Sequence, residues 1–108
     1  MLLGNKVSKI LAYGQPIDMR KSFNGLISLA KVELKEDPLS GILFVFINKR
    51  RNYLKSIYWD RTGYCLFAKK LESGRFSFPK EEDKQELSEQ LLKLILDGIR
   101  LGRTRRIS

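Results

Sequence analysis

The residues with the clearest chemical potential are cations that recur among the aromatic side chains of residues 48–75. This stretch has eight lysines and arginines against two carboxylates, Asp60 and Glu72, which gives a net charge of +6. Surface cations bind phosphates and release the counterions of a nucleic acid, and exposed aromatic rings can stack on bases. The alternative is a solvated charged face, and the aromatic rings themselves are expected to belong to the core. The candidate phosphate contacts in the stretch are Arg50, Arg51, Lys55, Lys69, Lys70 and Arg75.

Two further groups of cations lie outside this stretch. Arg20 and Lys21 follow Asp18 at the start of an expected helix, where positive charge opposes the helix dipole. They could close around a phosphate, or they could simply extend into water. The residues after 99 contain four arginines and no acid, among them Arg103, Arg105 and Arg106. This tail could be a phosphate-binding arm, or it could keep the chain end soluble.

The composition supports a polyanionic partner. The 108 residues carry a formal net charge of +9, which favours nucleic acid, and DNA is the expected partner. No stretch reaches the roughly 18 apolar residues of a membrane-spanning helix, and the N-terminus lacks the apolar run of a signal peptide, so a cytoplasmic protein without a membrane partner is expected. The single cysteine, Cys65, is expected to be a core thiol because it lies within an apolar strand.

Catalysis is not expected. Histidine is absent and there is one cysteine, which removes the usual zinc sites. Asp18, Asp60 and Glu72 are the candidate metal ligands for a nuclease, but capping and turn geometry explain two of them and no spacing brings the three together. We therefore expect no enzyme activity, no metal, no cofactor and no small-molecule ligand.

The pattern of apolar residues predicts an α+β fold: an antiparallel β-meander sheet of four to five strands, covered by two α-helices. Proline, glycine and charged residues at 35–41 separate the first helix from a strand, 42–47, that is apolar on both faces and therefore central. A three-residue loop at 61–63 with a left-handed Gly63 should close one hairpin. The expected strands are 6–13 at an edge, 42–47, 53–60, 64–71 and 75–78, the expected helices are 18–34 and 89–97, and 80–86 is a polar link.

The final helix has two interpretations. Ser88 is placed as its N-cap and Gly98 as the residue that ends it. Its apolar residues are nearly continuous, so it is either buried on more than one side or meets a partner protein. The candidate partner-binding residues are Leu91, Leu92 and Ile95. We expect a single domain over residues 1–99 and a basic tail over 100–108.

Four segments of the chain resemble a known family. They are DMRKSFNGL from Asp18, SGILFVFINKRR from Ser40, YWDRTGYCLFAKKLESGRFSFP from Tyr58, and LILDGI from Leu94. Together they are similar to the TnpB accessory proteins of the insertion-sequence-sixty-six family of bacterial transposons. The resemblance implies a protein encoded beside a separate large transposase, which helps to mobilise the element without cutting DNA strands.

Two functional hypotheses follow from the sequence. The first is a non-catalytic accessory protein of DNA transposition that binds DNA through its basic sheet and turn surface. The second is a protein-interaction module that docks on the transposase through the apolar C-terminal helix and does not contact DNA.

Overall fold

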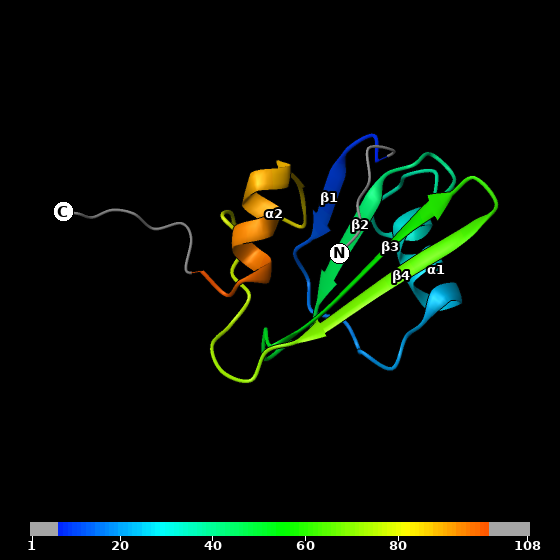
Figure 1. Ribbon diagram of the computed structural model, residues 1–108. Coiled ribbons are helices and arrows are strands. Elements are labelled where there is room, and N and C mark those ends of the chain that lie inside the picture. The colour runs from blue at the N-terminus through cyan, green and yellow to red at the C-terminus, as the bar shows by residue number, and fades with distance from the viewer. Residues whose placement is uncertain (1–6, 100–108) are drawn as a thin grey trace.

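A computed structural model describes residues 7–99 of the chain, which form a five-stranded sheet and two helices (Figure 1). In sequence order the elements are β1 (Ile10–Tyr13), α1 (Phe23–Val32), β2 (Leu43–Ile47), β3 (Tyr53–Asp60), β4 (Gly63–Lys70), β5 (Lys84–Leu87) and α2 (Glu89–Leu96). The α+β class with two helices agrees with the sequence prediction. The expected domain boundary at residue 99 stays a prediction, because residues 100–108 lie outside the described part of the chain.

The sheet is mixed, which corrects the expected antiparallel meander. Its strand order is β4-β3-β2-β1-β5, and β1 pairs with β2 in parallel, with Leu11 opposite Phe44. The prediction that the first strand lies at an edge was wrong, because β5 covers its other side in antiparallel pairing. The parallel pairing of β1 and β2 follows from the crossover through α1, which returns the chain to the end of the sheet where β1 began.

The core has two layers, one on each side of the sheet. All five residues of β2 are buried, as the prediction of a central strand requires. On one face, Leu26 and Ala30 of α1 pack against β1 and β2 in a cluster that contains Phe44 and Phe46. On the other face, Leu92 and Ile95 of α2 pack in a second cluster. Each helix therefore covers its own face of the sheet.

The expected strand at 75–78 does not form, and β5 forms instead within the expected polar link. Phe76 and Phe78 are nevertheless buried in the α2-side cluster. In β5, Gln85 and Leu87 are buried while Lys84 and Glu86 are exposed, which is the alternation of a strand with one buried face. The Gln85 amide exchanges hydrogen bonds with the backbone of residue 80, so its polar atoms are satisfied on burial.

The first helix is shorter than residues 18–34. It begins at Phe23, and Ser22 at its N-cap makes no side-chain capping hydrogen bond. Asp18 accepts the amide hydrogen of Arg20, as expected, but it organises a separate turn in which the Lys21 amide donates to the Asp18 carbonyl. Asp18 is therefore the start of a turn and not the cap of α1.

The final helix agrees closely with the prediction. The Ser88 hydroxyl accepts the Leu91 amide hydrogen at 3.1 Å, so Ser88 is its N-cap. Gly98 follows with a φ of 75°, the left-handed conformation expected of the residue that ends a helix. No helix within residues 7–99 is long and apolar enough to cross a membrane.

The hairpin of β3 and β4 differs from prediction at its turn and at Cys65. Asp60 pairs with Gly63, so the turn has two residues, and Arg61 takes the left-handed conformation that was assigned to Gly63. Cys65 is exposed, so the prediction of a core thiol was wrong. It lies on β4, which is an edge strand, beyond the part of the sheet that α2 covers.

Candidate nucleic-acid interface

The turn between β2 and β3 is held by the side chain of Asn48. Its Oδ1 accepts the amide hydrogens of Asn52 and Tyr53, both at 3.0 Å, and its Nδ2 donates to Asn52 Oδ1 at 2.8 Å. Arg51 takes a φ of 62° to complete the turn. Polar contacts of Asn48 therefore fix the backbone of the turn. The side chains of Arg50 and Arg51 are exposed and make no ion pair with a described residue.

The end of β4 and the loop after it lie against this turn. The Leu71 amide donates to the Asn52 carbonyl at 2.8 Å, and the Phe76 amide donates to the Arg51 carbonyl at 2.6 Å. These two bonds bring the exposed side chains of Lys70 and Arg75 to the end of the sheet that holds Arg50 and Arg51. Four of the predicted phosphate contacts, from separate turns of the chain, are thus gathered in one region.

The loop before α1 adds two cations on the same side. The Ile17 amide donates to the Ile47 carbonyl at the end of β2 at 3.0 Å, so the loop runs past the turn between β2 and β3. Arg20 and Lys21 are both exposed. We call the exposed cations in these three segments the basic end: Arg20, Lys21, Lys49, Arg50, Arg51, Lys70 and Arg75.

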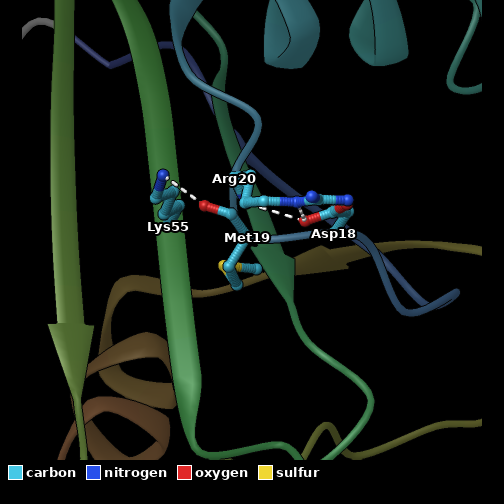
Figure 2. A network of polar contacts seen from close by, with 4 residues as sticks. All are labelled: Asp18, Met19, Arg20 and Lys55. Atoms are coloured by element: carbon cyan, nitrogen blue, oxygen red, sulfur yellow. Dashed lines mark hydrogen bonds and ion pairs between the residues drawn. The ribbon is translucent and has the colours of Figure 1, made fainter.

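The Arg20 guanidinium is bound to Asp18 (Figure 2). Its Nε lies 3.0 Å and its Nη2 2.6 Å from Asp18 Oδ2. These hydrogen bonds, with the one from the Arg20 amide, lower the pKa of Asp18 to about 2. Asp18 therefore stays ionised, and the charge of Arg20 is largely balanced before any ligand arrives.

Lys55 has a structural role. It is 9% exposed, and its Nζ donates to the carbonyl oxygen of Met19 at 2.7 Å (Figure 2). The same Nζ donates to the carbonyl oxygen of Lys21, also at 2.7 Å. The ammonium group joins β3 to the loop before α1. It donates hydrogen bonds to two carbonyl oxygens that lie in this loop, outside any helix. Its predicted contact with phosphate is not retained, because the side chain is buried and its ammonium group is already bound to two carbonyl oxygens.

Lys69 is held in a similar way on the opposite face. Its Nζ donates to the carbonyl oxygen of Leu96, the last residue of α2, at 2.7 Å. A cation at this position also interacts favourably with the negative end of the helix dipole. We therefore leave Lys69 out of the basic end. Lys84, which the sequence did not single out, donates to the Leu34 carbonyl at 2.9 Å and pairs with Glu36 after α1.

The aromatic residues of the hairpin are mostly packed. Tyr64 packs against the α1-side cluster and Tyr58 against the α2-side cluster. Burial raises the pKa of both phenols. Trp59 meets Tyr64 edge to face at 5.0 Å. The Tyr53 ring is the one beside the basic end, with Lys70 Nζ at 6.0 Å from its centroid.

The candidate partner-binding residues of α2 belong largely to the core. Leu92 and Ile95 are 1% and 0% exposed, and Leu91 is half-buried. The two buried side chains pack on the sheet, which explains the apolar run of the helix and corrects its interpretation as a docking surface. The accessible apolar side chain on this helix is Leu94, at 40% exposed.

The three carboxylates considered for a nuclease do not converge. Asp60 and Glu72 lie beyond opposite ends of β4, and Asp18 is paired with Arg20. Within residues 7–99 no group of three or more acidic or cysteine side chains could hold a metal ion. Arg103, Arg105 and Arg106 lie outside the described residues.

Comparisons with known proteins place these residues in a family. Residues 8–106 match the family described as IS66 Orf2-like protein, TnpB_IS66. The chain is also similar to two uncharacterized proteins of Sinorhizobium fredii (strain NBRC 101917 / NGR234). It is 39% identical to y4jC over 99 residues, 91% of this chain and 85% of the relative, and 39% identical to y4hO over 97 residues, 89% and 84%.

No solved structure matches the chain. The family match spans every described segment that contributes to the basic end, and the resemblance inferred from the sequence is confirmed. The chain therefore belongs to the IS66 Orf2-like family of transposition accessory proteins.

Proposed function

We propose that the basic end binds the sugar-phosphate backbone of DNA and that the protein assists transposition in the cytoplasm without cutting the strands itself. The observation that carries this proposal is the gathering of seven exposed cations from three segments, of which Arg20 alone is paired with a described acid, Asp18. Like charges at one end of the sheet repel one another, which opposes folding. A polyanion would remove that repulsion and gain counterion release.

The backbone geometry supports a fixed binding surface. Asn48, Lys55 and the two hydrogen bonds from residues 71 and 76 fix the three segments relative to one another. Because the segments are ordered before DNA arrives, little backbone conformational entropy would be lost on binding. The cations of the basic end lie in loops, in a turn and at the end of a strand, and none of them lies on a helix that could enter a groove. This arrangement favours contacts to phosphates over contacts to base edges.

A salt series with matched variants tests the proposal. The variant Arg50→Ala/Arg51→Ala/Arg75→Ala removes three cations from the basic end. The control Lys9→Ala/Lys31→Ala/Arg61→Ala removes three exposed cations that lie elsewhere, so its net charge is identical. Affinity for a short DNA duplex is measured across salt concentrations by fluorescence anisotropy. The slope of log K against log salt should fall by about 0.9 for each phosphate that the variant no longer neutralises.

The expected result is a shallower slope and weaker binding for the first triple variant only. Equal losses of affinity in the two variants would mean that general charge, and not the basic end, attracts DNA. Absence of binding to DNA at low salt would overturn the proposal. Element-encoded proteins, the transposase first among them, are the partners that family membership leads us to propose.

The alternative of docking through Leu91, Leu92 and Ile95 is not supported, because Leu92 and Ile95 are buried against the sheet and Leu91 is half-buried. A transposase pull-down that survives nuclease treatment and is abolished by Leu94→Asp would favour docking through the exposed side of α2 instead. The nuclease alternative predicts cleavage with magnesium or manganese that disappears in Asp60→Asn.

A further inference from the structure

The two edges of the sheet differ in a way that bears on self-association. An edge strand presents unpaired N–H and C=O groups, and proteins commonly protect such edges with short strands and charged residues. The β5 edge follows this rule, since it has four residues and exposes Lys84 and Glu86. The β4 edge does not. It has eight residues, and the first six of them, Gly63 to Ala68, carry no charge.

The β4 strand is also regular enough to accept another strand. It pairs with β3 through eight consecutive residue pairs, from Asp60 with Gly63 to Tyr53 with Lys70, without a bulge. Among residues 7–99 no strand pairs with its outer side. Cys65 and Ala68 are exposed there, and Tyr64, Leu66 and Phe67 are half-buried. The edge thus combines free backbone groups with apolar side chains on both faces.

We propose that β4 pairs with β4 of a second copy of this chain in antiparallel orientation, about a two-fold axis perpendicular to the sheet near Leu66. The two five-stranded sheets would then form one continuous sheet. Such an interface uses the same surface on both copies, as two-fold dimers require. It satisfies the backbone groups that the edge leaves open.

The charge distribution along β4 is what favours a second copy in this orientation. The strand is uncharged at its start and centre, and its cations, Lys69 and Lys70, are both at its end. Antiparallel pairing about Leu66 places these lysines at opposite ends of the joint, facing the turn residues Thr62 and Gly63 of the other copy. Parallel pairing would set each lysine beside its counterpart, which is destabilising. The two basic ends would also lie at opposite ends of the joint.

The proposal does not depend on DNA binding, and the oligomeric state tests it directly. Light scattering after size-exclusion chromatography, over a series of protein concentrations, should approach twice the 12.6 kDa mass of the chain. Cys65 is exposed, so Cys65→Glu should preserve the monomer fold while it places two carboxylates near the axis. The dimer dissociation constant should rise by about tenfold or more.

Two control variants separate this effect from changes in charge and in the thiol. Gln90→Glu adds the same charge at an exposed position on α2, and Cys65→Ser removes the thiol without adding charge. Both should dimerise as the unmodified chain does. A monomer at every concentration would overturn the proposal. This holds even if β4 then pairs with a strand of another protein, because the proposed partner is a second copy of this chain. A dimer that Cys65→Glu leaves intact would also overturn it.

Cross-linking locates the contact. The chain has one cysteine, and it lies one residue from the proposed axis. A short bismaleimide should therefore join two chains of the unmodified protein through Cys65 and should give no covalent dimer with Cys65→Ser. A non-covalent dimer whose Cys65 residues react singly but never cross-link would show that the interface lies elsewhere.

Discussion

The ammonium nitrogen of Lys55 lies 2.7 Å from the carbonyl oxygen of Lys21, so one lysine of a basic protein stabilises the backbone of another. The same nitrogen binds the Met19 carbonyl at 2.7 Å. Lys69 and Lys84 bind carbonyl oxygens of Leu96 and Leu34 in the same manner. Two candidate phosphate contacts, Lys55 and Lys69, and a third lysine, Lys84, thus attach loops and helix ends to the sheet.

Replacement of Lys55 should therefore cost stability. Lys55→Met keeps the aliphatic length but leaves two carbonyl oxygens without their donor, and the free energy of unfolding should fall by about 1–3 kcal/mol. Urea unfolding followed by circular dichroism measures it. The control is Lys70→Met on the neighbouring strand, where an exposed side chain should change stability by no more than about 0.5 kcal/mol. Equal effects would contradict the structural role of Lys55.

Glycine at position 61, in the turn between β3 and β4, should stabilise the protein. Arg61 has a φ of 55°, a left-handed conformation that costs a side-chain-bearing residue about 1–2 kcal/mol. Arg61→Gly should raise the free energy of unfolding by about 0.5–1 kcal/mol after the greater entropy of the unfolded glycine is included. Arg61→Ala is the control, because it removes the same charge and keeps the strain. Thermal and urea unfolding should show a gain for glycine alone.

The Asp18 carboxyl should titrate at an unusually low pH. Its pKa is about 2 against an ordinary value of 3.8, first because the Arg20 side chain binds it. A pKa lowered in the folded state contributes stability above the unfolded value, and this contribution is lost as the pH falls from about 4 towards 2. Carbon-13 NMR of the carboxyl group measures the midpoint. Arg20→Ala should move that midpoint up towards 3.8, and an unchanged midpoint would contradict the assigned cause.

Alanine substitutions of Leu92 and Leu94 should change the stability by different amounts, because one side chain is in the core and the other is exposed on the same helix. Leu92→Ala removes a side chain that is 1% exposed and should lower the free energy of unfolding by about 2–5 kcal/mol. Leu94 is 40% exposed, so Leu94→Ala should change it by about 0.5 kcal/mol. Both are measured by urea denaturation. A small loss of stability for Leu92→Ala would mean that α2 is only loosely attached to the sheet.

The sequence by itself determined the local elements whose signals lie within a few residues. The apolar run of β2 predicted a strand covered on both faces, and Ser88 and Gly98 marked the ends of α2. The family was also recognisable from four short segments, since it depends on residue identity and order. In each case the evidence lies within a few neighbouring residues.

Only the tertiary structure decided how those elements combine and which cations are available. Whether β1 lies inside the sheet depends on β5, which pairs with it although the two strands are more than 70 residues apart in sequence. Likewise, nothing near Lys55 or Lys69 in sequence reveals the carbonyl that each binds, because the partners lie 34 to 36 and 27 residues away. A lysine that binds a backbone carbonyl and one that faces solvent have the same local sequence signal. The chain's fold alone separates them, because it decides which carbonyl groups come within reach of each ammonium.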